Sequence, residues 1–171
     1  GALRRIFHET NQAWVDASYA SNAGWIWIRG GQAFIVLSER DGWRHAYVYS
    51  RDGKELALLT PGQFDIIERA VVDEGGGWFY FYASPDNATQ KYLYRVRLDG
   101  TGASERVTPA NQPGTHDYDF SPDAKWAFHT YSSFDNPPVT ELVQLPDHRV
   151  VRVLEDNDEL RKKMKPLISQ P

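Results

Sequence analysis

The sequence contains no cysteine and only one methionine among its 171 residues. Without cysteine, the chain forms no disulfide bond and has no thiolate to act as a nucleophile or a metal ligand. The same absence leaves the cellular compartment open, because a cysteine-free chain fits a reducing cytosol and an oxidising periplasm equally well.

The sequence also lacks a block of basic residues and a long apolar run. Its 19 Lys and Arg are outnumbered by 23 Asp and Glu, for a formal net charge of −4. A nucleic-acid partner is disfavoured, because binding would need a positive face that neutralises phosphates. No apolar run approaches the roughly 18 residues that span a bilayer, so we expect no membrane segment.

Aromatic residues are abundant: six Trp, nine Tyr and eight Phe make up 13% of the chain, and charged residues make up 25%. This composition is typical of a folded globular protein, since a disordered chain would be short of aromatics. The length allows one domain with a real core. The chain opens in mid-pattern with Gly1 rather than Met, so we expect it to be a piece of a longer protein.

The apolar segments are short and read as strands, because aromatic and β-branched residues dominate them. Turn signals separate them, and Asp-Gly pairs supply the positive φ that tight hairpins need. We therefore expect antiparallel hairpins in series. The predicted strands are Trp25–Ile28, Ala33–Leu37, His45–Tyr49, Ile66–Val72, Trp78–Tyr82, Tyr92–Leu98, Trp126–Tyr131 and Val139–Leu145.

The hairpins repeat along the chain. Turn aspartates Asp52, Asp99 and Asp147 are 47 and 48 positions apart, and Thr60-Pro61 recurs 48 positions later as Thr108-Pro109. A period of about 40–50 residues with four strands in each repeat is the signature of a β-propeller blade.

The predicted fold is all-β: a single β-propeller fragment over residues 1–171, with about three four-stranded antiparallel blades. The blades cover residues 25–62, 63–110 and 111–155. A β-sandwich is the alternative, because it also spaces short strands closely. We favour the propeller because a sandwich gives no reason for the turns to share one phase.

Only the C-terminal end looks helical. Asp156-Asn157-Asp158 can cap a helix, and Glu159–Met164 follows, with acidic residues leading and basic residues trailing as the helix dipole prefers. Pro166 would end the helix. Such a short helix is unstable alone in water, so we expect it to pack against something.

Three stretches resemble the propeller of dipeptidyl peptidase IV and its bacterial relatives: Ser38–His45, Thr130–Pro138 and Arg152–Asn157. Between them, Phe120–Trp126 is similar to a turn found in many propeller repeats, although Ala124 stands where glycine is usual. The resemblance covers nearly the whole chain, in the right order. It identifies the chain as a member of the dipeptidyl peptidase IV family.

The resemblance implies a serine exopeptidase that removes dipeptides from peptide N-termini, often after Pro or Ala, without a cofactor. The propeller would shape and gate the cavity, and residues 156–167 would lead to an α/β-hydrolase domain that carries the Ser, Asp and His. A glutamate pair earlier in the propeller would hold the substrate's amino terminus by charge. The family resemblance also suggests a periplasmic or otherwise extracytoplasmic location.

The chain itself lacks the catalytic parts of that family. It contains no Gly-x-Ser-x-Gly, the sharp turn that presents the nucleophile of an α/β-hydrolase, and no adjacent Glu-Glu pair. We therefore expect no catalytic residue and no activity from this chain alone.

One stretch could contact substrate. In the family, the segment after a Trp-Val pair runs along the cavity wall and can carry an arginine. Trp14-Val15 matches the pair, but no arginine follows directly. Asp16 and Tyr19 remain as candidate substrate contacts, with an ordinary loop role as the alternative.

The five histidines show no metal-ligand spacing, so we expect no metal site. His45 is expected to make a structural hydrogen bond. His116 with Asp117 and Asp119 could form an acid/base or metal site, but strand alternation places the two aspartates on one face, where hydrogen bonding to the ladder and turns is the simpler role.

Two functions stay open on the sequence: the propeller portion of a dipeptidyl peptidase, and a non-enzymatic propeller that binds a protein partner. A third, a propeller sugar hydrolase, would need paired carboxylates on facing strands, and no convincing pair is present. Because three blades cannot close a ring, we expect the end blades to expose apolar faces. The chain would then self-associate through these blades or be an ordered piece of a longer protein. The expected contact surface contains Trp25, Trp27, Trp126 and Phe128.

Overall fold

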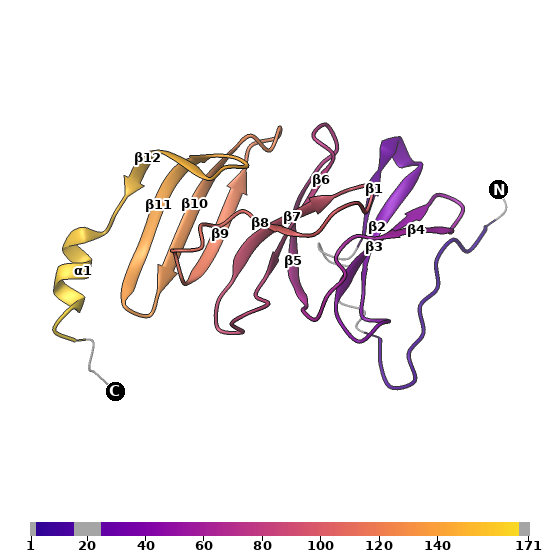
Figure 1. Cartoon of the computed structure of the whole chain (residues 1–171), viewed down its shortest axis with the longest axis horizontal. Coiled ribbons are helices and arrows are strands. Elements are labelled where there is room, and N and C mark those ends of the chain that lie inside the picture. Colours follow the sequence, from indigo (N-terminus) through magenta and orange to yellow (C-terminus); the bar gives the residue numbers. More distant parts are fainter. Residues whose placement is uncertain (1–2, 16–24, 168–171) are drawn as a thin grey trace.

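The computed structural model describes residues 3–15 and 25–167, which form three antiparallel sheets and one α-helix (Figure 1). Each sheet has four strands, and strands that follow one another in the sequence are neighbours in the sheet. The predicted all-β fold with a short C-terminal helix is confirmed. The strands are β1 (Trp25–Ile28), β2 (Ala33–Ser38), β3 (His45–Ser50) and β4 (Glu55–Leu58); β5 (Ile66–Asp73), β6 (Trp78–Ala83), β7 (Tyr92–Arg97) and β8 (Glu105–Arg106); and β9 (Thr115–Phe120), β10 (Trp126–Ser133), β11 (Asn136–Gln144) and β12 (Arg149–Glu155), followed by α1 (Asp158–Met164).

The three sheets lie in a row along the long axis of the molecule, with the helix α1 beyond the third (Figure 1). Strand β6 in the middle sheet shows how they are held together, because successive side chains of a strand point to opposite faces. Phe79 and Phe81 pack in the core shared with the first sheet, whereas Tyr80 and Tyr82 pack in the core shared with the third. Both faces of β6 are covered, and this explains why the strand consists of aromatic and apolar residues throughout.

Part of the outer face of the first sheet is covered by residues 3–15, which we call the N-terminal strap. Phe7 of the strap lies edge-on to Phe34 and Tyr49, with ring centroids 6.3 and 5.3 Å apart. Both of these residues are consequently buried. The expectation that both end blades expose an apolar face is thus wrong for the face of the first sheet that the strap covers. Trp25 and Trp27 at its edge remain 38% and 43% exposed.

The outer face of the third sheet has no such cover among the described residues. Phe128 is 52% exposed there and Trp126 is 37% exposed, as expected for an end blade. Their neighbours on β10, Ala127 and His129, point the other way and are buried against the second sheet. One face of this sheet is therefore solvated although it carries large aromatic side chains.

The Asp-Gly turns have the backbone that the sequence predicts. Gly42, Gly53 and Gly100 have φ of 95°, 88° and 78°, in the left-handed region that favours glycine. Ala124, which replaces the usual glycine of the Phe120–Trp126 turn, is also left-handed, with φ of 52°.

The helix α1 begins differently from the expected cap. Asn157 precedes the helix with φ of 52°, and its side chain makes no capping hydrogen bond. Its amide Nδ2 instead donates to the carbonyl of Pro138, and Asp156 accepts the N–H of Asp158 at 2.9 Å. The helix packs on the sheet through Arg161, whose Nε donates to Asn136 at 2.9 Å. The Asn157 side chain therefore makes a tertiary hydrogen bond to Pro138 in place of the expected capping hydrogen bond.

Replacement of Gly114 by alanine should destabilise the third sheet by about 2–4 kcal/mol, from strain and overlap together. Gly114 has φ of 144°, and an added Cβ would lie 2.3 Å from the carbonyl oxygen of Ser132. The matched control is Gly102→Ala, where φ is 77° but no atom lies within 4 Å, so only about 1 kcal/mol of strain is expected. Urea unfolding followed by tryptophan fluorescence measures both, and equal losses would contradict the proposed overlap.

Candidate functional site

The two candidate substrate contacts, Asp16 and Tyr19, lie outside the described residues. The residues that lead to them are described. Asn11 Oδ1 accepts the N–H of Ala13 at 2.9 Å and turns the chain there, and Trp14 beyond the turn is 73% exposed. The strap therefore presents the Trp14-Val15 pair at the surface.

A partly buried polar cluster anchors the strap just before this turn. The hydroxyl of Ser38, which is fully buried, donates to Glu9 of the strap and accepts from Arg40 Nε at 2.9 Å. Arg40 also lies over the ring of Tyr47, 4.4 Å from its centroid. Sequence reasoning did not find Glu9 and Arg40, although Arg40 lies in one of the stretches that carry the resemblance.

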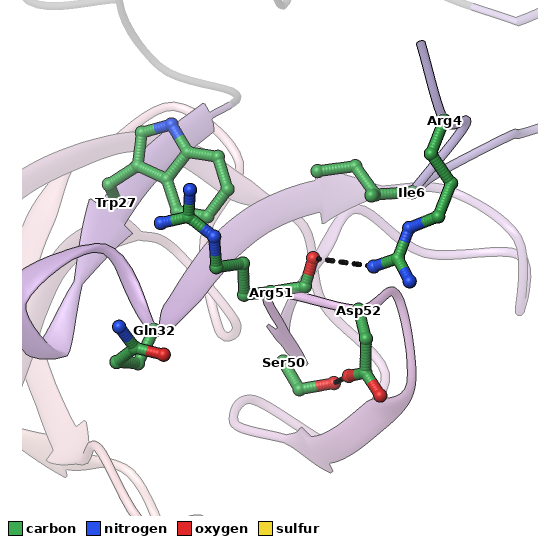
Figure 2. A pocket seen from close by; sticks show the side chains of 7 residues that line it. All are labelled: Arg4, Ile6, Trp27, Gln32, Ser50, Arg51 and Asp52. Carbon is green, nitrogen blue, oxygen red and sulfur yellow. Dashed lines mark hydrogen bonds between the residues drawn. The ribbon is translucent and has the colours of Figure 1, made fainter. Parts of the chain in front are cut away.

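A pocket of about 610 Å³ lies where the strap meets the first sheet (Figure 2). Figure 2 shows Arg51 extended beside the Trp27 indole and Arg4 pointing at the Arg51 carbonyl, to which it donates at 3.4 Å. Arg51 also donates to the Gly31 carbonyl at 3.1 Å. Since these arginines bind the chain's own carbonyls, we interpret the pocket as a structural junction. Its lining residues are Arg4, Ile6, Trp27, Gln32, Ser50, Arg51 and Asp52.

The first strands of the three sheets form a second candidate surface. Each of β1, β5 and β9 is an edge strand, and polar bonds join these edges between sheets. Arg69 on β5 donates to the carbonyl of Trp25 on β1 at 3.4 Å. The described side chains that these strands expose are Trp25, Trp27, Ile67, Glu68, Thr115, Asp117 and Asp119.

Lys91 joins the second and third sheets at this surface. Its ammonium group pairs with Glu68 of β5 at 3.4 Å and with Asp117 of β9, and lies 4.7 Å from the centre of the Tyr82 ring. Asp117 is therefore an ion-pair partner that bridges two sheets. A partly exposed pair of this kind contributes up to about 1 kcal/mol.

The structure separates His116 from its two neighbouring aspartates. Asp117 and Asp119 share the exposed face of β9, as alternation predicts, whereas His116 is fully buried on the other face. These three residues consequently form no shared acid/base or metal site. His45 makes the expected hydrogen bond, through Nδ1 to Asp41 at 2.8 Å. Burial acts to raise the pKa of Asp41, but hydrogen bonds from His45 and Tyr47 outweigh it and lower that pKa.

Within residues 3–15 and 25–167, no group of three or more His, Asp or Glu side chains is placed to hold a metal ion. The described helix α1 is not long or apolar enough to cross a membrane. The two candidate surfaces, the strap on the first sheet and the edge formed by β1, β5 and β9, thus consist of aromatic rings and ion pairs. Such surfaces are suited to forming the wall of a cavity or an interface with another domain.

The repeated four-stranded sheets, packed face to face with an open face on the third, define a fragment of a β-propeller. Residues 1–138 match the sequence family described as the dipeptidyl peptidase IV N-terminal region. The chain therefore belongs to the family of proteins with a dipeptidyl peptidase IV N-terminal region.

Relatives agree in sequence and in structure. The chain is 32% identical over 126 residues to a protein of Emericella nidulans named "Probable dipeptidyl-aminopeptidase B", which covers 71% of this chain and 14% of that protein. It is 27% identical over 159 residues to dipeptidyl peptidase 4 of Trichophyton rubrum, covering 89% and 19%. The crystal structure of Porphyromonas gingivalis dipeptidyl peptidase 4 matches 94% of this chain with a TM-score of 0.81 and 26% identity. The chain spans 22% of that protein.

Proposed function

We propose that this chain is the propeller portion of a serine-type dipeptidyl peptidase, where it shapes and gates the cavity in which dipeptides are cleaved from peptide N-termini. The observation that carries the proposal is the structural match to Porphyromonas gingivalis dipeptidyl peptidase 4 over 94% of the chain. The reaction itself would belong to an α/β-hydrolase domain of the same parent protein. The family resemblance also leads us to propose an extracytoplasmic location.

The edge formed by β1, β5 and β9 is the part of the chain that we assign to the cavity wall. Arg69 bonds to Trp25, and Lys91 pairs with one carboxylate on β5 and one on β9. These bonds hold the three first strands close to one another, as expected for strands that surround a common axis. Glu68, Asp117 and Asp119 give this edge three carboxylates, against the two positive charges of Lys91 and Arg69. An acidic wall favours the positively charged amino terminus of a peptide.

The chain alone should not hydrolyse a dipeptide substrate with a chromogenic leaving group, whereas the full-length parent should. The reason is that the sequence has no Gly-x-Ser-x-Gly to present a serine nucleophile. Absorbance assays on both proteins, with a serine-directed inhibitor as control, measure this. The inhibitor would abolish the activity of a contaminating serine peptidase. Turnover by the purified chain that persists in the presence of the inhibitor would contradict the proposal.

The sequence of the parent gene after Pro171 separates this function from the alternative. A hydrolase domain with Gly-x-Ser-x-Gly supports the peptidase. Further blades followed by a stop codon would instead support a propeller that binds a protein partner, and a full-length parent without activity on any dipeptide substrate would do the same.

A further inference from the structure

Three histidines and one glutamate meet in the interior of the third sheet, on the face turned toward the second sheet. His116 comes from β9, His129 from β10, Glu141 from β11 and His148 from the turn between β11 and β12. His116 and His129 have no exposed surface, and Glu141 and His148 are 7% and 6% exposed. None of these side chains has a part in the proposed function.

The cluster forms a chain of hydrogen bonds whose directions follow from its first member. His116 Nε2 lies 3.0 Å from the carbonyl oxygen of Gln112, which can only accept, so Nε2 carries the proton. The other nitrogen of neutral His116, Nδ1, must then accept from His129 Nε2, which lies 2.9 Å away. Neutral His129 is left with an acceptor, Nδ1, facing Glu141 Oε2 at 3.3 Å.

This last contact requires a proton, because an imidazole lone pair and a carboxylate oxygen repel each other. The proton belongs on Glu141, which then donates to His129. Burial raises the pKa of Glu141, and burial, together with repulsion from the other two histidines, lowers the pKa of His129 to about 3. Both shifts favour a neutral acid beside a neutral imidazole.

His148 adds a buried imidazole whose protonation is unfavourable. Its ring lies edge-on to His129, with centroids 4.6 Å apart, and neither ring nitrogen has a hydrogen-bond partner on another described residue. A proton on His148 would place a positive charge beside His129 without a counter-ion. Burial accordingly lowers the pKa of His148, and it lowers the pKa of His116 to about 4.

The groups that surround the cluster offer little compensation. Among the described residues, Glu141 is the carboxylate at ion-pair distance from these rings, and Asp117 on the far face is paired with Lys91. Tyrosines from four strands contact the rings or each other, and none is charged at acidic pH. The remaining groups that act on the cluster are Tyr82 of β6, Tyr92 of β7, Arg106 of β8, Tyr118 of β9, Tyr131 of β10 and, through Tyr131, Arg161 of α1.

We propose that His116, His129, His148 and Glu141 form an acid-sensitive switch, which keeps the third sheet closed on the second at neutral pH and opens it in a mildly acidic medium. Protonation removes the acceptor on which the bond between His116 and His129 depends and places like charges in contact. The sheet then opens because its histidines are solvated in the open state, where the free energy needed to charge them is lower.

The direction follows from proton linkage. The three histidine pKa values are lower in the closed sheet than the ordinary 6.5, so their stabilisation is complete above pH 6.5 and is lost as the pH falls below it. Glu141 has the opposite sign, because its raised pKa favours the closed sheet at low pH and less as the pH rises. With three histidines against one glutamate, opening dominates on the acid side.

Amide hydrogen exchange tests the switch in the third sheet of the chain, at pH 5 and pH 7 and after correction for intrinsic exchange rates. The exchange rates give the equilibrium constant for opening of the third sheet. Each histidine that stays neutral in the closed sheet should make this constant about 20-fold larger at pH 5 than at pH 7. In His129→Gln, whose amide can both donate and accept, the ratio of the constant at pH 5 to that at pH 7 should be about 20-fold smaller than in the original chain. The matched control His8→Gln, at an exposed histidine, should leave it unchanged. An unaltered ratio in His129→Gln would overturn the proposal.

Glu141→Gln provides an independent test, because its amide donates to His129 at every pH. If the proton lies on Glu141, the variant should open no more than the original chain at pH 7. If Glu141 is instead an anion paired with a charged His129, the variant should open more than about tenfold more at pH 7, because it leaves a buried cation unpaired, and the proposal is then wrong.

Discussion

Replacing Phe81 by alanine is expected to destabilise the chain by about 3–5 kcal/mol, enough to unfold much of it at 37 °C. Phe81 has no exposed surface in the core between the first and second sheets. Its ring stacks with Phe79 and Tyr94 at centroid distances of 5.7 and 5.8 Å, and with Phe64 at 6.2 Å. Truncation would leave a cavity that the three neighbouring rings, held on β6, on β7 and in the loop between β4 and β5, cannot easily fill.

The matched control is Phe134→Ala, the same change at a residue that is 88% exposed in the turn between β10 and β11. It should change stability by no more than about 0.5 kcal/mol. Urea unfolding followed by circular dichroism compares the two variants. A loss below about 1 kcal/mol at Phe81 would mean that the first two sheets do not share the core described above.

The chain is expected to self-associate at micromolar concentration through the outer face of the third sheet. This face exposes Phe128 and Trp126, whereas the N-terminal strap covers part of the corresponding face of the first sheet and leaves Trp25 and Trp27 partly exposed. In a symmetric dimer each substitution acts twice, so losing one buried Phe128 from each copy should cost about 3–6 kcal/mol. The Phe128→Glu variant should therefore dissociate at least about 100-fold more readily.

Sedimentation velocity over a concentration series measures this association. Phe134→Glu introduces the same charge at an exposed phenylalanine away from the sheet face, and should leave the association intact. A stable monomer at all concentrations, with no binding of a dye for apolar surfaces, would show that the third sheet does not need a partner. Equal weakening by both variants would point to net charge as the cause.

The strands with the strongest signals could be predicted from the sequence, because their cause is local. A run such as Trp78–Tyr82 has few alternatives to a buried strand, and an Asp-Gly pair such as Asp52-Gly53 supplies the left-handed residue of its turn. The repeat then follows from the constant spacing of these turns. The strands β4, β8, β9 and β12 were not in the list of predicted strands; all four lie at sheet edges, and a sheet edge needs fewer apolar residues than a sheet centre.

The position of each polar group depended on the tertiary structure. Alternation alone places Asp117 and Asp119 together, but nothing in the sequence pairs Asp117 with Lys91, which is 26 residues away and belongs to another sheet. The strap gave no strand signal, since it makes no sheet and is ordered by contacts such as that between Phe7 and Tyr49. The predicted substrate contacts Asp16 and Tyr19 stay predictions.

The sequence by itself therefore determined the central strands, the turns and the repeat, and with them the propeller class. Periodicity and turn chemistry act between residues that are close along the chain, so they can be read without knowing the fold. Only the tertiary structure decided that His116, His129, Glu141 and His148 meet in one buried interior. Their hydrogen bonds and protonation depend on burial by a second sheet, and burial is a property of the packed molecule.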